Sequence, residues 1–402
     1  MENVKGIAGG VTAAVGFRAA GVSAGIKRSR KPDLALVAAE APAAAAGVFT
    51  RNQVQAAPVR ISRQRLAGGT AQAVLINSGC ANCLTGAAGM EDALRLSRAA
   101  SRALGIPDRR LLLMSTGVIG RRLPVARIER AVPALAGSLS RAHHGAAAAA
   151  ILTTDLLVKE AAVEALIGGR ACRVGGMAKG AGMIAPAMAT MLSVVTTDAR
   201  VAPGLLRRLL REAAAQTFNR ISVDGDMSTN DCVVALASGR SGVTVAPGTP
   251  AARIFARMLA SVLEALAALI VQDGEGASRV MEVLVEQART DAEAQACARQ
   301  IANSPLVKTM LAGGDPNVGR IAAATGASPA RFDPSRLEIL IGRQPVVRRG
   351  AAVKLDKLAA RELLHGPRVA VRVRLHAGRG AGRLLTCDLT EAYVRINARY
   401  TT

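Results

Sequence analysis

The chain has 402 residues, of which 50% are hydrophobic and 20% charged, and this globular composition excludes an intrinsically disordered chain. Such a length can bury more than one core, so we expect two or more layers or lobes without a need for disulfides. The formal net charge of +23 raises the possibility of a nucleic-acid partner.

The distribution of the charge argues against nucleic acid. Only 8 of the 52 basic residues are lysine, the arginines are spread over the whole chain, and there is no Trp to stack on bases. Segment 1–21 has no apolar core followed by a cleavage site, and Glu264 interrupts the longest apolar run. We therefore expect a cytoplasmic protein that binds neither nucleic acid nor membrane.

Strand-like apolar runs alternate with helical patterns along the chain, which predicts an α/β or α+β architecture. The Gly-Ala segment 145–150 could be a linker, but alanine favours a helix. The predicted strands are 71–77, 110–117, 171–176, 191–197, 279–287, 337–342, 368–375 and 382–389, and the predicted helices are 89–105, 125–139, 145–150, 204–218, 249–269 and 291–302.

Metal and nucleotide motifs are incomplete. Cys80 and Cys83 form the one close cysteine pair, and no second pair or histidine follows at a zinc spacing, so we expect reduced thiols and no metal. Segment 180–185 fits G-x-G-x-x-A, but Pro186 interrupts the helix that should follow. Segment 224–231 lacks the glycine and glutamate of a calcium loop, so we interpret it as a turn that supports a nearby site.

The four histidines lie in no setting that suggests catalysis, so a nucleophile in this chain would need another base. A threonine can supply its own base, because breaking the preceding peptide bond frees an α-amino group with a pKa near ~8. Thr190 follows the small residue Ala189 and immediately precedes the predicted strand 191–197. The alternative is that Thr190 is one more β-branched strand residue.

Several segments together resemble the self-processing arginine-biosynthetic ornithine acetyltransferases, also called glutamate N-acetyltransferases. The resemblance centres on GGMAKGAGMIAPAMATML, whose A-T-M-L element carries the family's threonine nucleophile. Other similar segments follow in the family's order over essentially the whole chain: 11–37, 46–59, 76–93, 115–120, 153–155, 217–231, 272–279, 306–321 and 388–402.

The resemblance implies cleavage between Ala189 and Thr190 into associated chains 1–189 and 190–402, with two copies of each. It implies a two-lobe α/β (α+β) layered sandwich whose β-sheets are covered by helices. Thr190 would take acetyl from N-acetylornithine and pass it to glutamate. The residues that match the family's oxyanion pair are Thr116 and Gly117, and those that match its substrate contacts are Thr153, Lys179, Thr190, Glu275, Asn397 and Thr402.

No cofactor is implied, apart from acetyl-CoA as an acetyl donor if the enzyme is bifunctional. Two different functions also stay open, namely a related self-processing aminopeptidase or amidase and a basic nucleic-acid-binding protein. The chain departs from the family pattern at Val158, Met227 and Val318, and these departures concern the fit of the substrate rather than the nucleophile.

Overall fold

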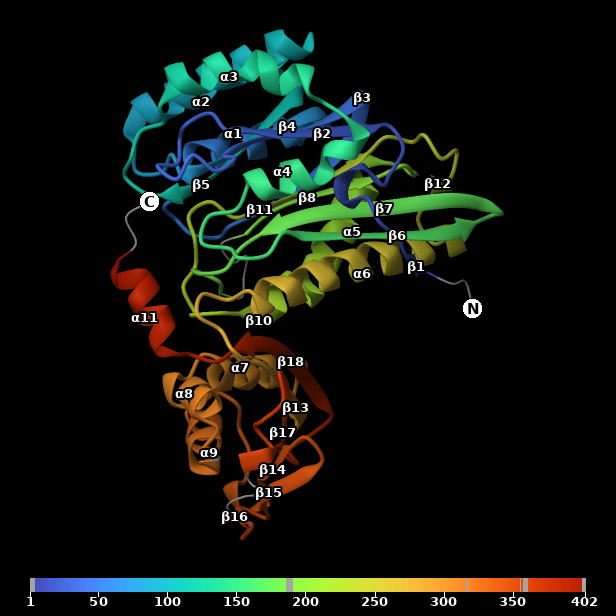
Figure 1. Cartoon of the computed structure of the whole chain (residues 1–402). Coiled ribbons are helices and arrows are strands. Elements are labelled where there is room, and N and C mark those ends of the chain that lie inside the picture. Colours follow the sequence, from blue (N-terminus) through green and yellow to red (C-terminus); the bar gives the residue numbers. More distant parts are fainter. Residues whose placement is uncertain (1–3, 186–190, 316, 355, 357–360, 400–402) are drawn as a thin grey trace.

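The computed structural model describes residues 4–185, 191–315, 317–354, 356 and 361–399. These residues form a larger and a smaller lobe, with the smaller lobe at the end of helix α6, Pro250–Gln272 (Figure 1). The predicted two-lobe, layered α/β architecture is confirmed.

The larger lobe is built on one mixed sheet. Among the described residues its strands follow the order β1-β6-β7-β8-β11-β3-β4-β5, and β2 pairs with β3. The bounds are β1 Lys5–Gly6, β2 Phe17–Val22, β3 Leu34–Phe49, β4 Thr70–Cys80, β5 Leu111–Val118, β6 Lys159–Ile167, β7 Arg170–Lys179, β8 Leu192–Thr197 and β11 Cys232–Ala237, while β9 Arg200–Val201 pairs separately with β12 Thr244–Val245.

Strand β3 folds this sheet into two layers. Its first half pairs with β2 and β4, its second half pairs with β11, and the register with β4 shifts between Ala38 and Ala43. Along β4, Val74 and Ile76 face the apolar interior between the two layers, where they meet Val194 of β8. Leu75 faces the opposite way, toward the helices.

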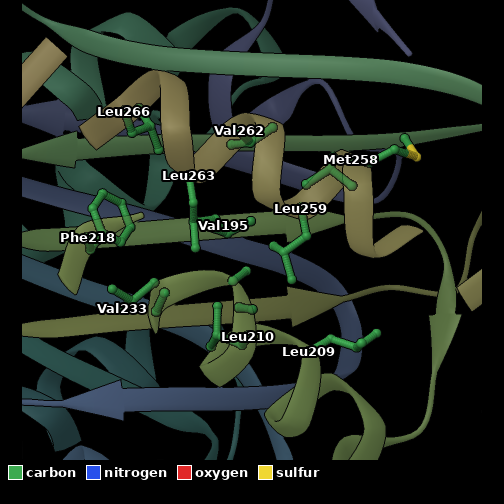
Figure 2. Close-up of a cluster of buried hydrophobic side chains, with 14 of the residues drawn as sticks. Val195, Leu209, Leu210, Phe218, Val233, Met258, Leu259, Val262, Leu263 and Leu266 are labelled. Carbon is green, nitrogen blue, oxygen red and sulfur yellow. The ribbon is translucent and has the colours of Figure 1, made fainter. Parts of the chain in front are cut away.

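Helices cover both outer faces, which gives a helix–sheet–sheet–helix sandwich (Figure 1). On one outer face Leu96 and Ile128 pack on the layer that contains β4. On the other, Val195 and Val233 of the sheet lie against Leu210 and Leu263 (Figure 2). The other α-helices described in the larger lobe are α1 Ala57–Arg65, α2 Gly86–Leu104, α3 Val125–Gly137 and α5 Pro203–Gln216, together with α4 His144–Ala150, whose alanines belong to the core between the two layers.

Helix α6 is long and apolar enough to cross a membrane, judged by its length and composition alone. Its side chains Val262, Leu263 and Leu266 are fully buried against the sheet, as in the core helix of a globular domain. Among the described residues no other helix passes the same test.

The smaller lobe has its own sheet and core. Its strand order is β10-β18-β13-β17-β14-β15-β16, and apolar residues of this sheet pack against helices α7 to α9. Helix α11, Glu391–Ala398, then leads back toward the larger lobe (Figure 1). The remaining bounds are β10 Ile221–Ser222, β13 Val280–Ala288, β14 Glu338–Ile341, β15 Gln344–Arg348, β16 Ala351–Ala352, β17 Arg368–Arg374, β18 Gly380–Cys387, α7 Asp291–Ala302, α8 Pro305–Gly313 and α9 Val318–Gly326.

The predicted strands and helices are confirmed with small shifts at their ends, including the helix at His144–Ala150. Segment 180–185 is not followed by a helix within the described residues. The long strand β3 is not predicted from the sequence, because eight alanines between Leu34 and Phe49 hide its apolar pattern and favour a helix.

Candidate active site

A pocket of about 130 Å³ lies where the ends of β5 and β7 meet the loops of the larger lobe and helix α11. It brings together six of the residues predicted from the sequence, while Ala189, Thr190 and Thr402 lie outside the described residues. Its lining is Ala81, Thr116, Gly117, Ile119, Thr153, Thr154, Lys179, Gly182, Met183, Ser228, Thr229, Asn230, Glu275 and Asn397.

Thr116 and Gly117 come from the end of β5. Gly117 has φ +129°, and a Cβ there would lie 2.3 Å from the carbonyl carbon of Gly79. Only glycine fits this backbone, which runs parallel to β4 with Gly79 opposite Gly117. Thr116 is buried beside it, so a hydroxyl and a backbone N–H are both held at this wall of the pocket.

Lys179, the last residue of β7, presents a buried ammonium group to the pocket. Its Nζ lies 3.7 Å from Asp155 Oδ2. Asp155 also accepts hydrogen bonds from the backbone N–H groups of Thr153, at 2.9 Å, and Gly180, at 2.6 Å. One buried carboxylate therefore fixes the surroundings of two predicted substrate contacts.

The charge network continues behind the pocket wall through Lys159. Its Nζ is fully buried, 2.7 Å from Asp155 Oδ1 and 2.5 Å from Asp273 Oδ2. Burial alone would raise the pKa of Asp155, but the ammonium groups of Lys179 and Lys159 hold that pKa well below its usual range. Asp155 is therefore ionised throughout the physiological pH range.

Glu275 lies two residues after Asp273 and forms the opposite charged wall of the pocket. Its Oε2 accepts a 2.7 Å hydrogen bond from Asn397 Nδ2 on α11, and its backbone N–H donates to the carbonyl of Ala181. A Cβ on Gly182 would lie 2.4 to 2.7 Å from the Glu275 carboxyl group. This side chain therefore packs directly on the backbone of the 180–185 loop.

Asp224 ties the 180–185 loop to α11. Its carboxylate accepts hydrogen bonds from the N–H groups of Met183, at 2.6 Å, and Ile184, at 2.8 Å, and from Tyr393 Oη, at 3.3 Å. Burial raises the pKa of this carboxyl, and the backbone N–H groups lower it in part. The loop that leads to residues 186–190 is thus anchored at its described end.

The sequence predicts no individual role for Asp155, Lys159, Asp273 or Asp224. A signal existed for three of them, since Asp155 stands in T-T-D, Asp273 stands in Q-D-G-E-G, and Asp224 begins segment 224–231, which is predicted to be a turn that supports a nearby site. None of the four histidines lines the pocket within the described part of the chain. No cluster of three potential metal ligands occurs there either, and all six cysteines are free and buried.

The family model and the curated relatives that match this chain belong to one family. The model of the ArgJ family matches residues 18–402. The arginine biosynthesis bifunctional protein ArgJ of Thermosynechococcus vestitus is 47% identical, with 100% of each chain covered. The chloroplastic protein of the same name from Sorghum bicolor is 46% identical over 99% of this chain and 88% of its own.

A solved structure of Mycobacterium tuberculosis ornithine acetyltransferase, complexed with ornithine, is 44% identical and covers 46% of this chain and 98% of its own, with a TM-score of 0.43.

Proposed function

Because this chain belongs to the ArgJ family, we propose that it is a glutamate N-acetyltransferase of arginine biosynthesis, which moves acetyl from N2-acetyl-L-ornithine to L-glutamate. The observation that carries the proposal is the meeting of Lys179, Glu275 and the Thr116–Gly117 pair in one pocket. Both substrates are α-amino acids, and this pocket offers a cation for a carboxylate and a carboxylate for the ornithine ammonium group.

The proposed reaction has two half-reactions. Thr190 Oγ attacks the acetyl carbonyl of N-acetylornithine, the amide C–N bond breaks, and ornithine leaves with the proton from the hydroxyl. The α-amine of glutamate then attacks the acetyl ester, the ester C–O bond breaks, and the proton from the amine restores the hydroxyl. Thr116 Oγ1 and the Gly117 N–H would stabilise the oxyanion in both steps, each worth ~3 kcal/mol or more.

Thr190 becomes competent, in this proposal, when the chain cleaves itself after Ala189. The freed α-amino group then serves as the base for the hydroxyl of the same residue. Chains 1–189 and 190–402 stay associated, two copies of each assemble, and the enzyme works in the cytoplasm. The buried position of Met191, next to Thr190 in the chain, supports a nucleophile at the start of an ordered strand.

Thr153, Asn397 and Thr402 complete the proposed substrate contacts. Thr153 and Asn397 line the pocket beside Lys179 and Glu275. The two charged residues and Asn397 favour an amino-acid acceptor over water, and therefore a transferase over an amidase.

A second activity, acetylation of glutamate by acetyl-CoA, is favoured by one finding. The relatives that match over the whole chain are named bifunctional. Acetyl-CoA would enter the cycle as an alternative donor to Thr190. It is the only coenzyme that the proposal includes.

Intact mass spectrometry together with an acetyl-transfer assay tests these proposals. The wild type should give two fragments, ending at Ala189 and starting at Thr190, and should transfer labelled acetyl from N-acetylornithine to glutamate. Thr190→Ala should remain one inactive chain. An uncleaved but active wild type would refute the mechanism, and glutamate-independent hydrolysis would favour the amidase. Product formed from acetyl-CoA alone would establish the second activity.

A further inference from the structure

The polar turn Ser228–Asp231 has no part in the chemistry described so far. It precedes β11, and all four of its side chains are buried. Thr50, which follows β3, holds the turn from outside, since its Oγ1 donates to the Ser228 carbonyl at 2.7 Å and its N–H donates to the Asp231 carbonyl. A buried polar turn of this kind needs partners for its side chains.

Asn230 finds its partners on the oxyanion side of the pocket. Its Nδ2 donates to the backbone carbonyls of Ser115 and Ala81, both at 2.7 Å. Thr229 Oγ1 donates to Asn230 Oδ1, also at 2.7 Å, which fixes the orientation of the amide. The Ser115 carbonyl belongs to the peptide group that leads into Thr116, so Asn230 holds the backbone of the oxyanion pair.

Asp231 finds its partner on the nucleophile side. Its Oδ1 accepts a 3.0 Å hydrogen bond from the N–H of Met191, the residue that follows Thr190. Asp231 is fully buried, and its Oδ2 has no hydrogen-bond partner in the described part of the chain. Burial raises the pKa of this carboxyl well above its usual range, and Met191, Ser228 and Lys179 offset the increase only in part.

The sheet itself does not set the distance between these two sides. Three strands, β11, β3 and β4, stand between β8 and β5 in the strand order, and β3 is the strand where the sheet folds over. Asn230 and Asp231, which are adjacent in one turn, connect the end of β5 with the start of β8. Each forms a hydrogen bond with a backbone group of the residue next to a proposed catalytic residue.

We propose that Asn230 and Asp231 are positioning residues that together set the place of the oxyanion pair relative to the threonine nucleophile. Asn230 fixes the end of β5, and Asp231 fixes the backbone just before β8. The inference rests on the proposed function, and it adds two residues that act through hydrogen bonds to the backbone, although Asn230 also belongs to the lining of the pocket. Such residues should affect kcat more than KM, because Lys179 and Glu275 remain in place.

Five variants test the inference in the full chain: Asn230→Ala, Asn230→Asp, Asp231→Ala, Asp231→Asn and the control Asn52→Ala. Asn52 is matched, because it donates from the same amide group to the carbonyl of Met227, beside the turn, and its hydrogen bonds within the described residues reach neither β5 nor β8. Circular dichroism and thermal melts would establish which variants fold. Asn230→Asp keeps the size of the side chain and replaces Asn230→Ala if that variant does not fold.

For both Asn230 variants we expect kcat to fall about 100-fold with KM for both substrates within about threefold, since a 1 Å misplacement costs about that much. Asp231→Ala should lose as much in kcat and should also slow the cleavage after Ala189. Asp231→Asn should stay within about fivefold of the wild type, because the amide oxygen of asparagine, in a side chain of the same size, still accepts the Met191 N–H. Asn52→Ala should match the wild type.

The inference would be overturned by folded Asn230 variants that keep kcat, or that change KM instead. Equal losses in Asp231→Asn and Asp231→Ala would overturn the role assigned to Asp231. A wild type that neither cleaves nor transfers acetyl would instead refute the proposed function, so the two failures are distinguishable.

Discussion

Replacing Lys159 by methionine should destabilise the protein strongly, although this side chain does not line the pocket. The variant keeps the length of the side chain but removes a fully buried ammonium group that lies 2.7 Å from Asp155 and 2.5 Å from Asp273. Removing one partner of a buried ion pair typically costs about 3–5 kcal/mol. At about 2.1 cal/mol/K per residue, the 402 residues give an unfolding entropy of about 0.8 kcal/mol/K, so we expect the Tm to fall by about 4–6 °C.

The pH dependence of this loss identifies its cause. In the wild type the pKa of Asp155 is depressed, so its contribution to stability is present above the unfolded pKa of about 4 and is lost as the pH falls through the folded value. In Lys159→Met the buried carboxyl of Asp155 lacks one of its two neighbouring cations, so protonation of this carboxyl costs less. The difference in Tm between the two proteins should therefore narrow as the pH is lowered from 7 to 4.

Differential scanning calorimetry at several pH values measures the effect, with Lys31→Met, at an exposed lysine, as the control. The double variant Lys159→Met/Asp273→Asn should recover part of the loss, because it also removes one of the stranded carboxylates. A loss of stability below about 0.5 kcal/mol, which is the usual effect of a surface substitution, would refute the reasoning. A difference in Tm between the wild type and Lys159→Met that stays constant or widens at low pH would also refute the reasoning.

Two substitutions and one labelling experiment test other parts of the structure. Gly117→Ala should lower kcat by about 100-fold, because its Cβ would clash with the backbone of β4 and displace an oxyanion donor, and steady-state kinetics with unchanged kcat would contradict this. Gly182→Ala should raise KM for N-acetylornithine about tenfold, because its Cβ would push the Glu275 carboxyl out of place, and an unaltered KM would count against Glu275 as the ammonium partner. Burial raises the pKa of Cys172 to about 12 and that of Cys387 to about 11, so neither thiol should react with iodoacetamide in the native protein at pH 8. Mass spectrometry of the alkylated protein measures this labelling. Rapid labelling of either cysteine would contradict the prediction.

The sequence predicts those elements whose side chains carry a clear pattern. Leucine and valine mark β5 and β17, and the amphipathic repeat marks α5. Strand β3 has no such pattern. A segment made largely of alanine can form a helix or a strand, and here its pairing with neighbouring strands decides for the strand. Those partners are β4 and β11, far away in the sequence.

The candidate site likewise contains residues that could be predicted from the sequence and residues that could not. Six of the residues that line the pocket could be named from the resemblance to a family, because they stand in recognisable segments. The roles of Lys159, behind the pocket, and of Asn230, in its lining, could not be named, because they arise from contacts between distant positions. Lys159 meets Asp273 across 114 positions, and Asn230 meets Ser115 across 115. The sequence predicts segment 224–231 only as a turn that supports a nearby site, and it does not show which part of the backbone Asn230 would hold.

The pairing of β7 with β8 has a consequence for how the mature protein would unfold. These strands run antiparallel, from Val174 opposite Thr197 to Lys179 opposite Leu192, and the proposed cut lies in the connection between them. After cleavage, this sheet would contain strands from two separate polypeptide chains, with β7 in one and β8 in the other. Thermal unfolding would then release two chains that must associate again to refold, so the Tm would rise with protein concentration. Cleavage is the source of this dependence, and an uncleaved chain would lack it. The cleavage that activates the enzyme would thus also change its refolding from a unimolecular into a bimolecular process.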